Sequence, residues 1–473
     1  MIDIVILNRN LRLHDNAALY YGSLNSNYIV IHLYDENYWK ANGRSVRQLK
    51  FSYECLQELD DNLKKIGSEI NIFEGSFDDL KKWIKINFND CCIHINHCTD
   101  INYFRKGFEK FKQEFGDGLK IYDDFGLQLT NFDRDTWSKN WNHVMHSSLL
   151  DAPKINKNSA EKNLIKFNEH KNKIKSKFTN MEHIQKGGTS VANELLESFL
   201  YERCEDYRVK MSSPSLSEDS CSRLSPHFTY GSISIRQVYQ RLNELLPSLD
   251  NKKDLYSFKK RLYWHCHFVQ KLHTEPELEF NSMHRMCDEL RTEHNNEMID
   301  KWIKGETGFP FLDACMKFLK INGWINFRMR AMIMSFASYN MWQPWQKTSP
   351  LLAELFTDYE PGIHISQVQM QSGVTGINLP RIYSIPKQSM DQDPSAEWIK
   401  NLLPQLNNVE PKLIHSAELN DAYLPQIVDL KVSAKFARDK VWGIRKSKEF
   451  KDEARNVYIK HGSRRRRNVK TTN

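Results

Sequence analysis

The first third of the chain alternates short apolar runs with stretches of helical periodicity. Residues 2–8 (IDIVILN) and 28–34 (YIVIHLY) are rich in β-branched residues and end in polar clusters, as buried parallel strands do. Similar runs follow at 69–75 and 92–98, and residues 46–67 have helical spacing and end at Gly67, a typical helix terminator. The pattern predicts an α/β domain over residues 1–135, with a parallel sheet of about five strands covered by helices on both faces.

The rest of the chain has a different rhythm. Residues 136–190 are rich in Lys, Asn and Ser and predict an interdomain linker. Apolar positions then recur at helical spacing, most clearly over 191–207, 234–246, 254–272, 309–323 and 349–358. In the last of these, Ser349 is the expected N-cap and Pro350 the first helical residue. We therefore predict an all-α domain over 191–440 and a basic tail over 441–473.

Composition limits the classes of protein to consider. The chain has 473 residues, 40% hydrophobic and 12% aromatic, which is enough for two domains with their own cores. No apolar run approaches the ~18 residues that a membrane span needs, and the opening MIDIVILNRNLR does not resemble a secretory signal. The nine scattered cysteines suit reduced thiols. We expect a cytoplasmic protein without a membrane partner, nucleoid-associated if the source is a bacterium.

The charge makes a polyanionic partner plausible. The formal net charge is +8, and the basic residues are concentrated in one internal segment and in the terminal HGSRRRRNVKTTN. The internal group comprises Lys162, Lys166, Lys171, Lys173, Lys175 and Lys177. Such runs serve either as solvated faces or as contacts to a phosphate backbone, and both interpretations stay open here.

The usual nucleotide and metal motifs are missing or poorly placed. No GxGxxG or GxxxxGK[ST] loop follows a strand. The segment CCIHINHC at 91–98 is rich in metal-ligating types, but strand alternation puts Cys91 and Ile93 on one face and Cys92 and His94 on the other. Ligands drawn from one short strand suit tetrahedral zinc poorly, so we predict no metal site.

Two arginines lie inside an apolar run, GWINFRMRAMIMSF at 323–336. Arg328 and Arg330 stay charged at any physiological pH, and burying either without a partner costs several kcal/mol. Asp358 and Glu360 are the candidate carboxylate partners, and a bound phosphate or an electron-rich ligand is the alternative. The hydroxyl-rich segment around Arg223 precedes another apolar run and suits either a helix cap or a phosphate cradle.

Four segments, in this order, resemble the cryptochrome/photolyase family. They are LNRNLRLHDNAALYYG (7–22), SRLSPHFTYGSIS (222–234), WIKGETGFPFLDACMKFLKINGWINFRMRAMIMSF (302–336) and RIYSIPKQSMDQDPSAEWIKNLLPQL (381–406). The resemblance implies a Rossmann-like N-terminal α/β domain and an all-α domain that binds FAD in a folded-back shape. This agrees with the periodicity and explains the missing dinucleotide fingerprint.

The resemblance also implies roles around the cofactor. The segment expected at the FAD diphosphate consists of Tyr207, Cys221, Ser222, Arg223, Leu224 and Ser225, although most relatives have Thr where this chain has Cys221. Arg330 and Asp358 match an ion pair beside the isoalloxazine ring, and Tyr359 and Glu360 complete that wall. His364 matches the residue that faces flavin N5, to which we expect it to donate a hydrogen bond. Arg328 matches an arginine that meets the DNA backbone.

On the substrate side the chain departs from the family pattern. Trp264 matches an aromatic residue that packs on a flipped pyrimidine dimer, but Arg261 and Met370 replace a Glu and a Trp that contact the dimer, and Ala331 and Phe327 replace a Met and an Asn. Trp302 and Trp345 match two members of an electron-transfer chain of tryptophans. Its innermost member aligns with Val368, which cannot carry an electron, and the candidate substitutes are Trp324, Trp342 and Tyr339.

The function that the resemblance implies is that of a deoxyribodipyrimidine photolyase. We expect a monomer that uses reduced FAD and blue light to repair cyclobutane pyrimidine dimers in UV-damaged DNA. The alternatives are a cryptochrome-type photoreceptor and a photolyase for (6–4) photoproducts, for which His364, His265 or His267 would be the proton donor. An antenna chromophore in the N-terminal domain, a folate or a deazaflavin, is compatible with the resemblance.

Overall fold

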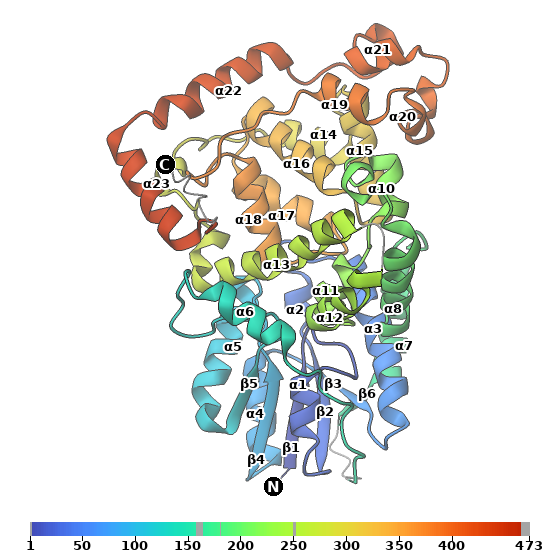
Figure 1. The fold of residues 1–473 in the computed structure, drawn as a ribbon, viewed down its shortest axis with the longest axis vertical. Helices are drawn as coiled ribbons and strands as arrows, with labels where there is room; N and C mark the ends of the chain where they lie inside the picture. The colour runs from blue at the N-terminus through green and yellow to red at the C-terminus, as the bar shows by residue number, and fades with distance from the viewer. Residues whose placement is uncertain (1, 158–163, 180, 249–251, 465–473) are drawn as a thin grey trace.

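The N-terminal part of the chain is a mostly parallel sheet between two layers of helices (Figure 1). The computed structural model describes residues 2–157, 164–179, 181–248 and 252–464. The strands are β1 (Ile2–Leu7), β2 (Tyr28–Tyr34), β3 (Ile70–Glu74), β4 (Cys91–Asn96), β5 (Leu119–Tyr122) and β6 (Ile165–Lys166). Their order is β5-β4-β1-β2-β3-β6, and only β6 runs antiparallel to its neighbour. The predicted α/β fold with a parallel sheet is confirmed.

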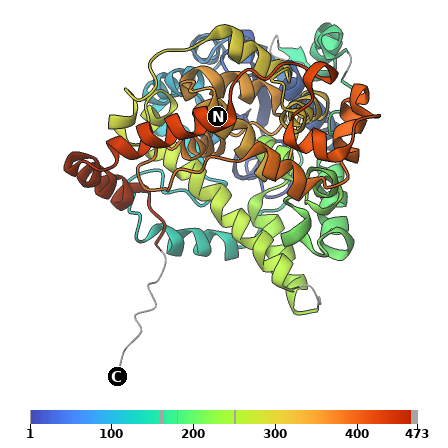
Figure 2. The same cartoon turned by 90° about the horizontal axis from the view of Figure 1, so that it is seen from above.

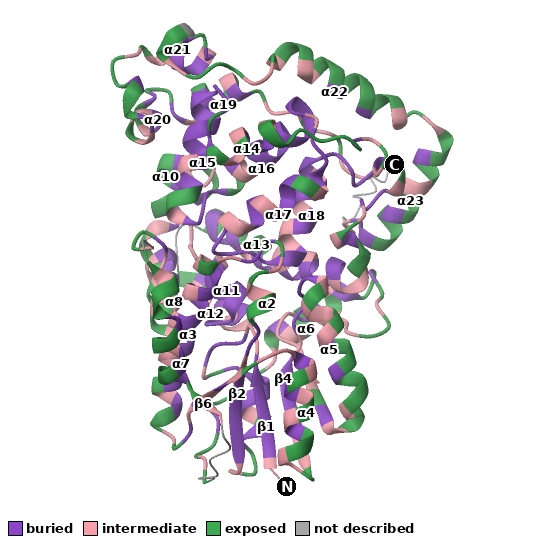
Figure 3. Cartoon of the chain, turned by 180° about the vertical axis from the view of Figure 1, so that it is seen from behind, coloured by how far each residue is buried: buried purple, intermediate pink, exposed green. Residues whose placement is uncertain are grey.

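Strand alternation builds two apolar cores, one on each face of this sheet. Ile4 and Ile6 of β1 pack with α4 and α5, whereas Val5 and Leu7 pack with α1, α3 and α7. The helices of this part are α1 (Ala17–Gly22), α2 (Glu36–Trp39), α3 (Val46–Lys64), α4 (Phe77–Asn87), α5 (Asn102–Phe115), α6 (Trp137–His146) and α7 (Phe167–Ile174). The central strands are accordingly buried along most of their length, while the outward faces of α4 and α5 are exposed (Figure 3).

The segment predicted as a linker, 136–190, contains structure of its own. It carries α6 and α7, and its strand β6 pairs with β3 through Ile165 and Ile72. Part of its basic charge is paired, because Lys166, Lys173 and Lys177 form ion pairs with Glu69, Glu74 and Glu36. Lys162 lies outside the described residues. The exact domain limits stay a prediction.

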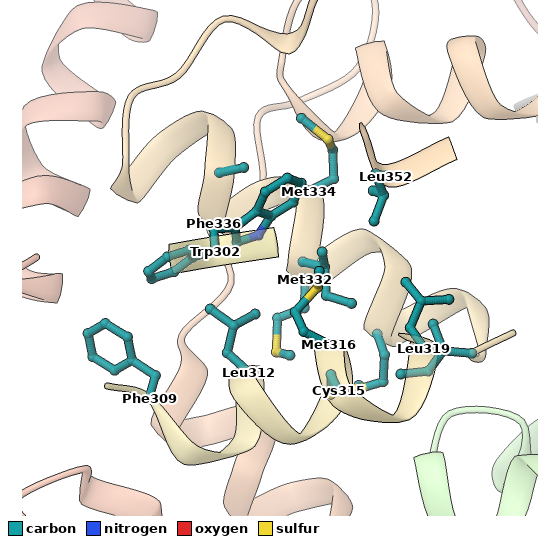
Figure 4. Close-up of a cluster of buried hydrophobic side chains, with 14 of the residues drawn as sticks. Trp302, Phe309, Leu312, Cys315, Met316, Leu319, Met332, Met334, Phe336 and Leu352 are labelled. Atoms are coloured by element: carbon teal, nitrogen blue, oxygen red, sulfur yellow. The ribbon is translucent and has the colours of Figure 1, made fainter. Parts of the chain in front are cut away.

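The second half of the chain is helical, as predicted. Its helices are α8 (Thr189–Ser198), α9 (Tyr207–Lys210), α10 (Pro214–Ser220), α11 (Ser225–Tyr230), α12 (Ile235–Leu245), α13 (Lys252–Thr274), α14 (Asn296–Lys304), α15 (Pro310–Asn322), α16 (Phe327–Ser335), α17 (Trp345–Leu355), α18 (Pro361–Gln371), α19 (Ile385–Gln392), α20 (Glu397–Leu402), α21 (Pro411–Ser416), α22 (Leu430–Ile444) and α23 (Lys448–His461). Its main core lies between α14, α15 and α16, where Trp302 packs beside Met334 and Phe336 (Figure 4). Among the described helices, none combines the length and apolarity that crossing a membrane requires.

The start of α17 differs from the prediction. The helix begins at Trp345 and Pro350 lies inside it, so Ser349 is not the N-cap. Trp345 is 3% exposed, and its Nε1 donates to Ser282 Oγ at 3.1 Å. Burying a Trp side chain stabilises by about 4–6 kcal/mol, which exceeds the roughly 3 kcal/mol that an internal Pro costs.

The predicted basic tail is helical over most of the part that is described. Seen from above, α22 crosses the helical layer and α23 lies at its edge (Figure 2). Ala437 and Val441 of α22 pack on Tyr339, so this end of the chain belongs to the folded body. Residues 465–473, which include most of the terminal arginine run, lie outside the described residues.

Candidate cofactor site and its surroundings

The two arginines of α16 have different partners. Arg330 Nη1 and Nη2 donate to Asp358 Oδ1 and Oδ2 at 3.1 and 2.8 Å, and Arg330 Nε donates to Ile325 O at 2.7 Å. The Asp358 side chain is 3% exposed and that of Arg330 is 26% exposed. Two parallel charge-assisted bonds are the geometry that makes a largely buried pair favourable. The predicted pairing of Arg330 with Asp358 is confirmed, and the guanidinium keeps an open side.

Arg328 has no such partner. It forms no ion pair or hydrogen bond with any residue in the described part of the chain, and its Nε is buried without a partner. Glu360, the other candidate carboxylate, instead accepts from Arg9 Nη1 at 2.6 Å. The expectation that Glu360 pairs with one of the two α16 arginines is therefore wrong, because the fold brings Arg9 from the end of β1 against the start of α18. Arg328 is left as a half-buried cation that can bind an external anion.

Glu360 and Tyr359 belong to a buried network between the two parts of the molecule. Arg9 also approaches Asp100, which pairs with Arg44, and the Arg44 guanidinium lies 4.9 Å from the centre of the Tyr359 ring. Burial raises the pKa of Glu360, and Arg9 opposes that rise. The Glu360 carboxylate thus faces the α/β part, and its predicted place in a flavin wall stays a prediction.

A cluster of arginines surrounds Cys221. Burial raises the pKa of the Cys221 thiol to about 11, and Arg223, Arg203, Arg261 and Arg330 each act to lower it. Burial likewise raises the pKa of Tyr207 to about 12, with Arg261 opposing. Tyr207, Cys221, Arg223 and Arg330 are therefore brought together, as the resemblance implies, and Arg261 joins them.

This cluster has more cations than carboxylates. Asp358 forms an ion pair with Arg330. The ion pair of Arg223 is with the half-exposed Glu218, with Arg223 Nη1 3.3 Å from Glu218 Oε1. Among described residues, Arg203 and Arg261 make no ion pair, and the Arg223 Nε is buried without a partner. A diphosphate would supply the missing negative charge, so these residues fit the phosphate portion of FAD.

The hydroxyl-rich turn beside the cluster is accessible to a ligand. Arg223 has a φ of 59°, and Ser222 Oγ accepts from Leu224 N at 3.4 Å. Ser222 and Ser225 are half-buried at the start of α11, where no side chain caps the helix. Leu224 is fully buried in the core around Phe228, so only its backbone can contact a cofactor.

His364 is oriented by Ser349. Its Nε2 lies 3.0 Å from the Ser349 carbonyl oxygen, and because a carbonyl only accepts, Nε2 carries the proton. Burial lowers the pKa of His364 to about 4, so the ring is neutral at pH 7. A neutral ring with its proton on Nε2 can only accept at Nδ1. The expected donation from His364 to flavin N5 is therefore disfavoured, and the place of His364 opposite N5 stays a prediction.

The residues predicted for the substrate side lie on three neighbouring helices. Trp264 is on α13, Phe327 and Arg328 are on α16, and Met370 is on α18, which packs against both other helices (Figure 1). Trp264 is half-buried and stacks on Phe268 with ring centres 5.7 Å apart. Phe327 is 43% exposed, and Arg261 is exposed one turn before Trp264. The structure thus places part-exposed aromatic and basic side chains on adjacent helices.

The predicted electron carriers are deep in the helical core. Trp302 is fully buried and Trp345 is 3% exposed, and both belong to the apolar cluster that contains Val368. Of the candidate substitutes, Trp324 belongs to the same cluster, whereas Tyr339 and Trp342 belong to a separate one. Tyr339 is fully buried under Arg291, whose guanidinium also lies 4.4 Å from the Trp342 ring, and Trp342 is half-exposed. Trp324 packs against Arg223 at 4.1 Å.

A cavity lies apart from these residues, at the carboxyl ends of β1, β2 and β4. It has a volume of about 550 Å³, and the helical part closes it with Glu279 and Phe280. Its lining includes Arg9, Tyr38 and Asp100 of the interdomain network. Ligands of open parallel sheets bind at the carboxyl ends of the strands, so the predicted strands indicate where such a cavity lies. They do not indicate which residues line it.

Comparisons with known proteins agree with this architecture. Residues 4–94 match the family model described as DNA photolyase, and residues 258–443 match the FAD binding domain of DNA photolyase. A deoxyribodipyrimidine photo-lyase of Alkalihalophilus pseudofirmus is 29% identical over 233 residues, which is 48% of this chain and about half, 47%, of that protein. Cryptochrome-1 of Spalax judaei is 23% identical over 86% of this chain and 74% of its own length. An archaeal photolyase from Sulfolobus tokodaii, whose crystal structure contains two FAD molecules, superposes with a TM-score of 0.79 at 24% identity, covering 94% of this chain and 100% of that one.

Proposed function

Because the chain belongs to the photolyase/cryptochrome family and carries that family's FAD-binding domain, we propose that it repairs cyclobutane pyrimidine dimers in DNA with blue light. When bound and reduced, FAD supplies the electron that blue light drives into the dimer. The protein's tasks are to hold the cofactor, to bind DNA phosphates and to receive a dimer flipped out of the duplex.

The observation that carries the proposal is the unpaired Arg328 beside the exposed Phe327. A cation without a protein partner at the rim of a cofactor site suits a DNA phosphate, which contributes affinity without sequence information. Trp264 offers a stacking face to a pyrimidine dimer that has left the duplex. The arginine cluster around Cys221 holds the cofactor's phosphates, and the Arg330–Asp358 pair closes the site beside it.

A direct repair assay tests this proposal. The flavin of the purified protein is reduced chemically, an oligonucleotide with one thymine cyclobutane dimer is added, and dimer loss is followed by chromatography in blue light and in the dark. We expect loss only in the light, slowed at least tenfold by Trp264→Ala and unchanged by the matched control Trp442→Ala, whose indole is 41% exposed on α22. Light-independent loss, or no loss with FAD bound, contradicts the proposal.

The two alternatives make different predictions in the same experiment. A (6–4) photolyase needs a protonated histidine, but burial lowers the pKa values of His265, His267 and His364 to about 3, 2 and 4, which disfavours this lesion. A cryptochrome-type photoreceptor is favoured by Arg261 and Met370, which replace expected dimer contacts. It predicts light-dependent flavin reduction without repair of either lesion.

We also propose that the 550 Å³ cavity at the carboxyl ends of the strands binds a planar antenna chromophore. Its volume is that of a small-molecule site, and Tyr38, Trp39 and Phe280 offer aromatic walls. A folate, a deazaflavin or a second flavin fits this chemistry. Excitation of an added chromophore should increase the repair rate, and Tyr38→Ala should remove the increase while leaving flavin-driven repair intact.

A further inference from the structure

Three side chains of metal-ligating type meet at the opposite end of the sheet from the antenna cavity. They are Asp3 of β1 and Cys92 and His94 of β4, and their ligand atoms all lie within 4.8 Å of one another. Within this group, the His94 Nε2 and Asp3 Oδ1 are 3.1 Å apart. Asp3 and His94 are buried, and Cys92 is half-buried.

The strand register explains why these groups converge. Asp3 is the direct partner of Cys92 in the parallel β1–β4 ladder, so both side chains point to the same face of the sheet. His94 follows Cys92 by two residues and shares that face. Strand β4 alone carries no carboxylate on this face, and the neighbouring strand β1 supplies one through Asp3.

Neighbouring residues orient two of the three side chains through hydrogen bonds. His94 Nδ1 lies 2.8 Å from the Tyr122 hydroxyl, which orients the ring, and Asn25 Nδ2 donates to Asp3 Oδ2 at 3.0 Å. The Cys92 thiol makes no hydrogen bond with a described residue. Lys120 is the cation that acts on both Cys92 and His94, and it is exposed on β5.

We propose that Asp3, Cys92 and His94 form a binding site for Zn²⁺. A thiolate, an imidazole and a carboxylate favour zinc over magnesium or calcium, and a water molecule completes the tetrahedron from the half-exposed side of Cys92. Tetrahedral N and O ligands lie about 3.3 Å apart around zinc, close to the Asp3–His94 separation, and rotation of Cys92 supplies the remaining approach.

Binding of Zn²⁺ changes the protonation of Cys92 and His94. The Cys92 thiol releases its proton to solvent as the Zn–S bond forms. The His94 proton moves to Nδ1, where it is donated to the Tyr122 oxygen, and the Nε2 lone pair binds the metal. Two anionic ligands then neutralise Zn²⁺, and the ion joins the beginning of β1 to that of β4.

Cobalt substitution tests the site, because a thiolate bound to Co²⁺ gives a near-ultraviolet charge-transfer absorption. The full chain, without an affinity tag and stripped of metal with a chelator, is titrated with Co²⁺. We expect one equivalent to produce the band and Zn²⁺ to remove it. Cys92→Ser should abolish the band, and His94→Gln should weaken binding at least tenfold.

Cys91→Ser is the matched control. Cys91 is adjacent and equally half-buried, but it points to the opposite face, so its variant should keep the band. Zn²⁺ should also raise the unfolding temperature of the parent and of Cys91→Ser, but not of Cys92→Ser. Flavin absorbance reports that each variant is folded. Absence of the band at saturating Co²⁺, its persistence in Cys92→Ser, or equal loss in both serine variants would overturn the proposal.

Discussion

At the scale of single residues, function depends on which charged groups remain unpaired. Arg328 and Arg330 are two positions apart on α16, so they point to different sides of the helix. Asp358 neutralises Arg330 through two hydrogen bonds, whereas no described carboxylate reaches Arg328. The local sequence makes the two arginines look equivalent, and their neighbours give them separate roles.

Replacement of Arg328 by Ala should weaken binding to damaged and undamaged DNA together. The lost contact is to phosphate, so the slope of log K against log salt should fall by about one charge. Fluorescence anisotropy at several salt concentrations measures this slope. Arg455→Ala, which removes an exposed arginine of α23, is the control and should leave it unchanged. An unaltered slope in Arg328→Ala would remove Arg328 from the DNA surface.

His364→Asn should lower the midpoint potential of the bound flavin. Placed opposite flavin N5, as the resemblance implies, His364 would accept a hydrogen bond from the N5–H of reduced flavin, and that bond would stabilise the reduced form. An Asn that turns its amide N–H toward N5 would no longer accept this hydrogen bond. Losing one hydrogen bond of about 1 kcal/mol corresponds to about 40 mV for one electron. Spectroelectrochemical titration measures the shift. A higher potential in the variant would mean that His364 donates.

At the scale of elements, tertiary burial decides where helices begin and which of their charges are costly. Burial of Trp345 starts α17 four residues before the expected N-cap. On α13, Lys271 is only 9% exposed, and no carboxylate among the described residues forms an ion pair with it. Burial, followed by the nearby Arg134, lowers the pKa of Lys271 to about 8 from 10.5.

Lys271→Met should therefore stabilise the protein at neutral pH. Below pH 8 the lysine is protonated in both states, so the folded state carries the full cost of its burial, about 3 kcal/mol. Between pH 8 and 10.5 the folded state loses its proton first, so the cost falls and the advantage of Met should shrink. Denaturant unfolding at pH 7 and pH 10 measures the difference in free energy of unfolding between Lys271→Met and the parent at each pH. Lys260→Met, exposed on the same helix, should change neither.

At the scale of the whole molecule, buried charges join the α/β and helical parts. Arg9 follows β1 and lines the 550 Å³ cavity, Glu360 is the N-cap residue of α18, and the two side chains form an ion pair. Asp100 and Arg44 extend the pair into a network. This arrangement holds the two proposed chromophore sites in a fixed relation.

Glu360→Gln should destabilise the folded protein by about 2–3 kcal/mol. Arg9 would keep only Asp100 as a buried anion, with its Nε 3.5 Å from Asp100 Oδ2. Denaturant unfolding measures the loss, and Glu449→Gln on the exposed face of α23 serves as the control. Equal stability of Glu360→Gln and the parent would show that the network contributes nothing at this interface.

The sequence by itself determined the order of elements and the type of each part. Short apolar runs rich in β-branched residues predicted four strands, because a strand buried on both faces is apolar at nearly every position, and helical periodicity marked α12, α13 and α15. Motif resemblance pointed to Tyr207, Cys221 and Arg223 as one site, whereas Arg203 was not expected there and Arg261 was expected on the substrate side. It also led to the Arg330–Asp358 pair, which is 28 residues apart.

Only the tertiary structure decided the long-range pairings. Arg9 and Glu360 are 351 residues apart, and no local pattern links a residue after the first strand to the start of α18. The same holds for Asp3 beside Cys92 and His94, which meet because β4 inserts next to β1. The position of the proton on the His364 ring likewise depends on tertiary structure, because the Ser349 carbonyl of α17 accepts from Nε2. Periodicity encodes which face of an element is buried, but the neighbour that covers it is set by how the whole chain packs.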